Sequence, residues 1–158
     1  PWATLARLLA APHERGLIED AVIAASEAQA DAFWRLRDSI SEGERARGPA
    51  AQHDISVPPS AMACFMVEAA DRVEAAFPGT RAFGYGHLGD GNVHFHVRAP
   101  QGSARNWADS EQGKAASRLV HDLVTAAGGS ISAEHGIGQM KREELARLAT
   151  PARLQSLR

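Results

Sequence analysis

The sequence has little of several features that define whole classes of protein. It holds one cysteine, Cys64, in 158 residues, which excludes an internal disulfide and is compatible with a reducing compartment such as the cytoplasm. No apolar run approaches the roughly 18 residues of a membrane span. The net charge is only -2 and the basic residues are not grouped, which argues against nucleic-acid binding. We therefore expect a cytoplasmic protein, or one peripheral to a membrane, with no transmembrane segment.

The pattern of apolar residues predicts one domain of class α+β. Helices are expected over 4–11, 18–47, 60–77, 106–127, 141–148 and 151–158, and strands over 53–57, 81–86 and 93–97. Ser60 is the expected N-cap of its helix, and Cys64 within that helix is expected to be buried. Hairpin strands beside long helices indicate an antiparallel sheet with helices packed on one face.

The most informative segment covers residues 86–96. Its second half alternates apolar residues with His94 and His96, as in a strand with one buried face. The turn signal at 89–92, Gly-Asp-Gly-Asn, predicts a β-hairpin. The hairpin would bring His87 and His94 beside each other, where two imidazoles can share a divalent ion, with metal–nitrogen distances of roughly 2.0–2.1 Å for zinc.

A second segment, residues 132–138, supplies a carboxylate and a further imidazole. Glu134 is the expected third metal ligand, since two histidines and one carboxylate leave coordination positions open, as catalytic sites do. His135 follows directly, so one neighbour would face the metal and the other the substrate as general base. Zinc is the favoured ion, and iron and manganese suit the same ligands.

These motifs carry a family resemblance. The strings GHLGDGNVHFHV, SAEHGIGQMKR, HDISVP and GLIEDAVIAASEAQADAFWRLRDSI resemble the C-terminal, substrate-side domain of FAD-linked oxidases of the vanillyl-alcohol oxidase type. The resemblance is strongest to the group containing D-2-hydroxyglutarate dehydrogenase, D-lactate dehydrogenase and the flavin subunit of glycolate oxidase. It covers residues 16–142 and implies a fold of ferredoxin-like character.

The resemblance implies an FAD-dependent enzyme that oxidises a D-2-hydroxy acid to a 2-oxo acid. His87, His94 and Glu134 would hold the metal, and His135 would take the hydroxyl proton before hydride leaves for the flavin. Residues 1–158 would then form part of a C-terminal domain, inactive alone. The glycines of the hairpin do not precede a helix as in a dinucleotide-binding loop, so a separate N-terminal domain would hold FAD, and the FAD-binding residues remain unassigned.

The resemblance also implies substrate-binding residues. Arg37 matches the position that clamps a substrate carboxylate, and Ser41, one helical turn on, would add a hydrogen bond. Three residues depart from the usual pattern. Gln52 replaces a lysine, which argues against a second substrate carboxylate and hence against 2-hydroxyglutarate. Ser41 replaces a threonine. His96 replaces an asparagine, and a fourth metal ligand, a substrate contact and a spectator all remain open for it.

Two other functions are compatible with the same residues. A metal-dependent hydrolase or lyase would use the open site without flavin, and the isolated chain would then be active. A non-catalytic, metal-stabilised interaction module would use His96 as a fourth ligand. For the dehydrogenase, the expected partners are the hydroxy acid and an electron acceptor, either a protein or a quinone or cytochrome, and a homodimer is compatible with the sequence.

Overall fold

The computed structural model describes residues 2–156, which divide after Ala46 into two units. Each unit is described by itself. The first contains three helices: α1 (Trp2–Glu14), α2 (Glu27–Asp38) and α3 (Ile40–Ala46). The prediction of one continuous helix over 18–47 is therefore wrong.

Local hydrogen bonds explain why that helix is divided. The Ser26 side chain accepts the Gln29 N–H and so caps the start of α2. At the other end, the Ser39 hydroxyl donates to the Leu36 carbonyl at 2.7 Å. Such side-chain bonds compete with the helical ladder, and α2 ends at Asp38.

The second unit is built on a three-stranded antiparallel sheet of order β1-β3-β2. The strands are β1 (Ala50–Ser56), β2 (Arg81–His87) and β3 (Asn92–Arg98). Since β3 lies between β1 and β2 and is antiparallel to both, β1 and β2 run parallel on either side of it. A single bridge between Ser56 and Ser130 extends the pairing beyond β1. The predicted α+β class, hairpin and antiparallel sheet are confirmed.

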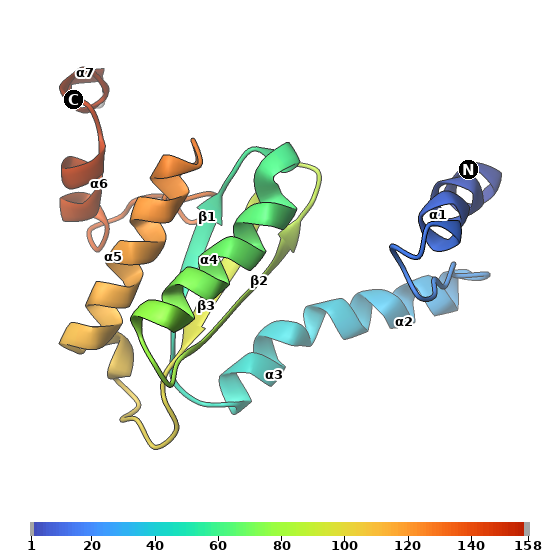
Figure 1. Ribbon diagram of the computed structural model, residues 1–158, viewed down its shortest axis with the longest axis horizontal. Coiled ribbons are helices and arrows are strands. Elements are labelled where there is room, and N and C mark those ends of the chain that lie inside the picture. Colours follow the sequence, from blue (N-terminus) through green and yellow to red (C-terminus); the bar gives the residue numbers. More distant parts are fainter. Residues whose placement is uncertain (1, 157–158) are drawn as a thin grey trace. The chain divides into compact units, whose positions relative to one another are not determined.

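Two helices cover one face of this sheet (Figure 1): α4 (Met62–Ala76) and α5 (Glu111–Ala126). The apolar alternation of β3 places Val93, Phe95 and Val97 at 0 % exposure, within the hydrophobic core formed with both helices. The other side chains of β3 therefore point to the sheet face opposite α4 and α5, and this alternation positions the histidines.

Both helices begin later than predicted, after short 3-10 turns. The turn η1 (Pro59–Ala61) precedes α4, and η2 (Trp107–Asp109) precedes α5. Ser60 therefore lies inside η1 and is not the N-cap of α4; Ala61 takes that place without a side-chain bond. Ser110, in contrast, caps α5 by accepting the Gly113 N–H at 3.1 Å.

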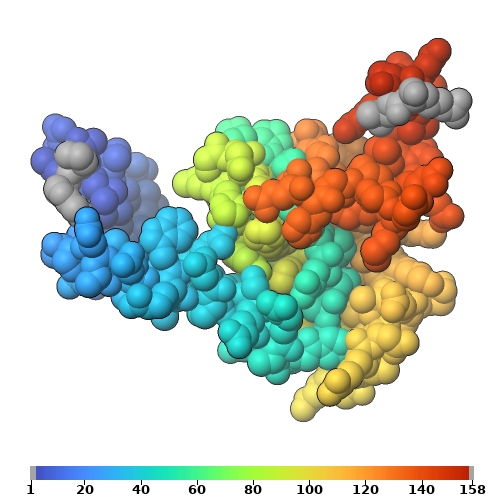
Figure 2. All heavy atoms as spheres, turned by 180° about the vertical axis from the view of Figure 1, so that it is seen from behind, coloured from blue at the N-terminus to red at the C-terminus, as the bar shows by residue number. Residues whose placement is uncertain are grey.

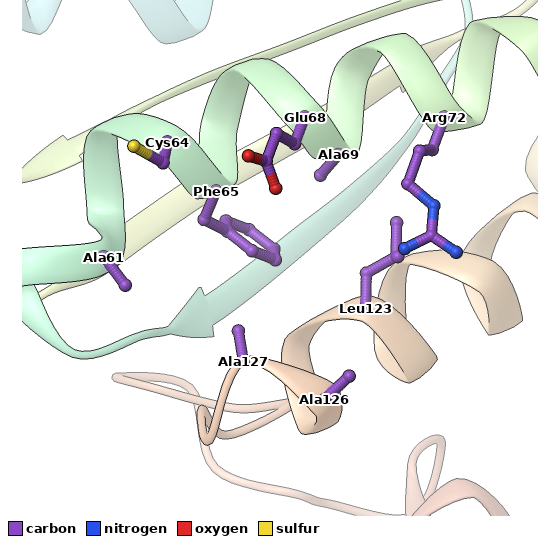
Figure 3. Close-up of a pocket in the computed structure, with 9 residues that line it drawn as sticks. All are labelled: Ala61, Cys64, Phe65, Glu68, Ala69, Arg72, Leu123, Ala126 and Ala127. Atoms are coloured by element: carbon purple, nitrogen blue, oxygen red, sulfur yellow. The ribbon is translucent and has the colours of Figure 1, made fainter.

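The prediction of a buried Cys64 is also wrong, because this side chain is exposed. The buried residues of α4 are Met62, Phe65, Ala69 and Val73, and Cys64 lies off this stripe. It lines a hollow between α4 and α5 together with Glu68 and Arg72 (Figure 3).

Two short helices follow α5 within the second unit, α6 (Arg142–Leu148) and α7 (Pro151–Ser156). The predicted helices in this region are confirmed, and the last two residues of the second lie outside the described part of the chain. No helix within residues 2–156 is long and apolar enough to cross a bilayer.

Candidate metal and substrate site

The hairpin places His87 and His94 on the sheet face opposite the helices. His87 is paired with Asn92 and His94 with Tyr85, so the two histidines are diagonal neighbours. Their ring centroids lie 5.7 Å apart. Gly91 closes the turn with φ +77°, and a Cβ there would collide with the Val57 carbonyl. A side chain is thus excluded from the point where the hairpin meets the end of β1.

Glu134 joins this histidine pair. One ligand atom from each of His87, His94 and Glu134 lies within 4.8 Å of the others. The closest approach between His87 and the carboxylate is 4.0 Å, from Nε2 to Oε1, and the two side chains are 40 % and 51 % exposed. The three predicted ligands therefore converge, and solvent or a substrate can reach them. This donor set fits a divalent transition ion such as zinc.

The loop that carries Glu134 is held by the carboxylate of Asp54 in β1. Its Oδ2 accepts the backbone N–H groups of Glu134 and His135, both at 2.8 Å. Its Oδ1 accepts the Asn92 side chain at 3.0 Å. Asp54 thus ties the loop to the start of β3. From behind, Figure 2 shows the orange segment that follows α5 lying against the yellow-green hairpin.

The same hydrogen bonds keep Asp54 ionised. Burial alone would raise the pKa of this 6 % exposed residue, but donors from His135, Glu134 and Asn92 hold its pKa below the ordinary value. The ionised carboxylate lies 3.8 Å from Nδ1 of His135, whose side chain is 73 % exposed.

The far end of the loop is fixed by Lys141. Its ammonium donates to the Ile131 carbonyl at 2.9 Å and lies 3.5 Å from the Asp54 carbonyl. Burial lowers the pKa of Lys141, while the Asp54 charge opposes this change. The bridge between Ser56 and Ser130 holds the near end. Both ends of the segment that carries Glu134 and His135 are therefore attached to β1.

A polar network between α5 and α6 supports the helix that follows this loop. Glu144 of α6 accepts a hydrogen bond from the buried His121 of α5 at 3.1 Å. It also forms an ion pair with Arg147 at 2.8 Å. Arg147 also reaches Asp122 of α5 at 2.7 Å. The Arg147 hydrogen bond lowers the pKa of Glu144, against the effect of burial. These bonds attach α6, and with it Lys141, to the packed core.

The predicted substrate residues fall in both units. Gln52 is exposed on β1 and pairs with His96 on the face that carries the metal cluster. His96 is not part of the three-residue cluster; its ring lies 5.4 Å from each of the rings of Phe83 and Tyr85. Arg37 lies in α2, 3.4 Å from Asp38, and Ser41 lies in α3. Their substrate roles stay predictions.

The sequence analysis assigned no functional role to Asp54 or Lys141. One signal was available for Asp54, because aspartate is rare inside strands. Their partners lie up to 87 residues away along the chain, so only the folded structure reveals the contacts.

The family is defined by a match over nearly the whole chain. A family model described as "FAD linked oxidases, C-terminal domain" matches residues 3–158, and the chain belongs to this family.

Several curated relatives give the same picture. A probable mitochondrial D-2-hydroxyglutarate dehydrogenase of Oryza sativa subsp. japonica is 36 % identical, over 90 % of this chain and 24 % of its own length. A D-2-hydroxyglutarate dehydrogenase of Xanthomonas citri pv. viticola is 38 % identical, over 84 % of this chain and 28 % of its own. A D-2-hydroxyglutarate dehydrogenase of Stutzerimonas stutzeri is 34 % identical, over 92 % of this chain and 31 % of its own length. The chain thus spans about a quarter of the length of these relatives.

Proposed function

We propose that this chain supplies the metal and substrate groups of an FAD-dependent dehydrogenase that oxidises a D-2-hydroxy acid to a 2-oxo acid. The observation that carries the proposal is the convergence of His87, His94 and Glu134 within 4.8 Å. The family and the names of the relatives support the reaction class. Since the matches cover only 24 %, 28 % and 31 % of the lengths of those relatives, we further propose that another part of the complete protein binds FAD.

The chemistry follows from the arrangement of donors. A 2-hydroxy acid can chelate one ion through its carboxylate and α-hydroxyl. When bound, the divalent ion would lower the pKa of that hydroxyl, and FAD would accept hydride from the α-carbon. The residues of this chain then hold the ion through His87, His94 and Glu134. The hydroxyl proton passes to His135 as the α-carbon–hydrogen bond breaks and the carbonyl forms.

Asp54 has a positioning role in this scheme. It fixes the backbone of both Glu134 and His135 through one oxygen, so the loop that carries the proposed ligand and base is held in place. Its carboxylate lies 3.8 Å from Nδ1 of the His135 ring. Arg37 is proposed to bind the substrate carboxylate through its planar fork, assisted by Ser41.

The test compares two histidine variants of the complete holoenzyme. Flavin reduction by D-2-hydroxyglutarate or D-lactate is followed in a stopped-flow spectrometer, and turnover with a redox dye that replaces the proposed protein or quinone acceptor. His135→Ala should slow flavin reduction by about 100-fold or more while metal content is unchanged. His13→Ala, an exposed histidine of α1, serves as the control. Loss of metal in His135→Ala would mean that the roles of Glu134 and His135 are exchanged. An unchanged rate would remove His135 from the proton-transfer step.

A further inference from the structure

A continuous row of rings runs across the sheet face opposite α4 and α5, away from the metal cluster. Neighbouring ring centroids are 5.7 Å apart for His87 and His94, 5.2 Å for His94 and Tyr85, 5.4 Å for Tyr85 and His96, and 5.4 Å for His96 and Phe83. The row ends at Arg98, whose guanidinium carbon lies 5.2 Å from the Phe83 centroid. A cation therefore stands at the opposite end of an aromatic surface that begins at the metal ligands.

The strand register shows the direction in which Arg98 leans. Arg98 is paired with Arg81, whereas Phe83 is paired with His96. The contact of Arg98 with Phe83 is therefore diagonal, and it directs the guanidinium back toward the level of His96. That level is one side-chain step, or about 7 Å along the strand, from His94.

This separation matches a short dicarboxylic acid. The two carboxyl carbons of a five-carbon diacid are joined by four bonds of about 1.5 Å each, so they stand roughly 5 Å apart in an extended chain. One end can lie at the metal cluster while the other reaches the guanidinium. Arginine is suited to this role because its fork binds a carboxylate through two hydrogen bonds while its plane remains stacked on a ring.

We propose that Arg98 is a specificity-determining residue that binds the far carboxylate of a dicarboxylic D-2-hydroxy acid, with the substrate chain lying along the half-buried rings of Tyr85 and Phe83. The proposal rests on the proposed function and extends it to a substrate class. It also bears on the argument that Gln52, in place of a lysine, disfavours a second substrate carboxylate. A neutral residue at that position does not leave this face without a cation, because Gln52 pairs with His96 and Arg98 lies two residues further along β3. Gln52 is placed to add a neutral hydrogen bond.

The experiment measures kcat/KM of the complete holoenzyme for two acids of equal chain length, D-2-hydroxyglutarate and D-2-hydroxypentanoate. Wild-type enzyme should prefer the diacid. Arg98→Met should lower kcat/KM for the diacid by about 10-fold or more, mainly through KM, and change the value for the monoacid by less than about threefold. Arg98→Lys, which keeps the charge, should retain part of the preference and shows that the position tolerates substitution.

Arg81→Met is the matched control, because Arg81 occupies the paired position on β2 and its side chain forms an ion pair with Glu74 at 3.1 Å. It should leave the ratio of the two kcat/KM values unchanged. The proposal is overturned if Arg98→Met does not alter that ratio, or if Arg81→Met alters it equally. These results leave the proposed function intact. If wild-type enzyme oxidises neither acid, nor any other 2-hydroxy acid, the proposed function fails as well.

Discussion

The Oδ2 atom of Asp54 accepts the backbone N–H of His135 at 2.8 Å, across 81 positions of the chain. The same oxygen accepts the N–H of Glu134 at the same distance. A proposed metal ligand and a proposed base are thus placed by one buried carboxylate. Because both contacts are made to backbone atoms, they set the position of the loop and leave the two side chains directed outward.

Replacing this carboxylate should weaken metal binding. Asp54→Asn retains an acceptor oxygen but removes the charge, so the loop that carries Glu134 loses two charge-assisted hydrogen bonds. Zinc affinity should fall by about 10- to 100-fold, as for other residues that orient metal ligands. Isothermal titration calorimetry with zinc measures the change. Asp71→Asn, on the exposed side of α4, is the control, and equal affinities for both variants would contradict the positioning role.

Arg37 gives a prediction about substrate affinity. If Arg37 binds the carboxylate of the hydroxy acid, Arg37→Met should raise KM by about 10-fold or more, with a smaller change in kcat. Arg35, two positions earlier in α2 and exposed, provides the control variant Arg35→Met. Steady-state kinetics of the complete enzyme separates the two, and an unchanged KM in Arg37→Met would identify Arg37 as an ordinary surface residue.

The buried His53 predicts a loss of stability at acid pH. Burial, with smaller contributions from the neighbouring charges of His121, Lys141 and His96, lowers the pKa of His53 to about 3, although its hydrogen bond with the Phe95 carbonyl opposes this. Below pH 6.5 the unfolded chain binds a proton at this residue that the folded chain does not. The free energy of unfolding should therefore decrease as pH falls, by about 2 kcal/mol between pH 6.5 and pH 5 from His53 alone.

Urea unfolding of wild type and His53→Asn across this range measures that contribution. The variant should lose less stability on acidification. The slope of its unfolding free energy against pH should be smaller than that of wild type by the contribution of one proton, about 1.4 kcal/mol per pH unit. His13→Asn, which changes an exposed histidine, should follow the wild-type slope. Parallel curves for His53→Asn and wild type would show that His53 is not held neutral in the folded protein.

The hairpin turn predicts a difference between two glycines. Gly91 and Gly102 have similar positive φ values, +77° and +82°, but a Cβ at Gly91 would meet the Val57 carbonyl, whereas one at Gly102 would meet no atom within 4 Å. Gly102→Ala should cost about 1 kcal/mol from the backbone conformation alone. Gly91→Ala should cost clearly more, since the Val57–Gly91 hydrogen bond must also shift. Equal midpoints of urea unfolding would contradict this contrast.

Local signals explain which parts of this structure could be predicted from sequence. Strict alternation around His94 and His96 and the Gly-Asp-Gly-Asn turn specify the hairpin within a dozen residues, and the strands form where expected. The break at Ser39 was missed because it depends on a serine hydroxyl bonding to the Leu36 carbonyl, which competes with an otherwise helical pattern.

The residue types of the candidate site could be predicted from sequence, but the contacts that support it could not. His87, His94 and Glu134 were chosen by their chemistry, and the structure brings them together. The anchoring of the loop by Asp54 and Lys141 depends on contacts between distant parts of the chain, which no local pattern records. The sequence also left three roles open for His96, and its place among the rings of Phe83 and Tyr85 became evident only from the strand register.

The central claim is that His87, His94 and Glu134 hold a divalent ion. Elemental analysis of the purified protein after incubation with zinc and dialysis tests it most directly, with the His87→Ala/His94→Ala double variant and His13→Ala measured beside wild type. We predict about one zinc per chain in wild type and His13→Ala, and close to none in the double variant. Equal zinc in the double variant and wild type, or no zinc in any of them, would contradict the claim.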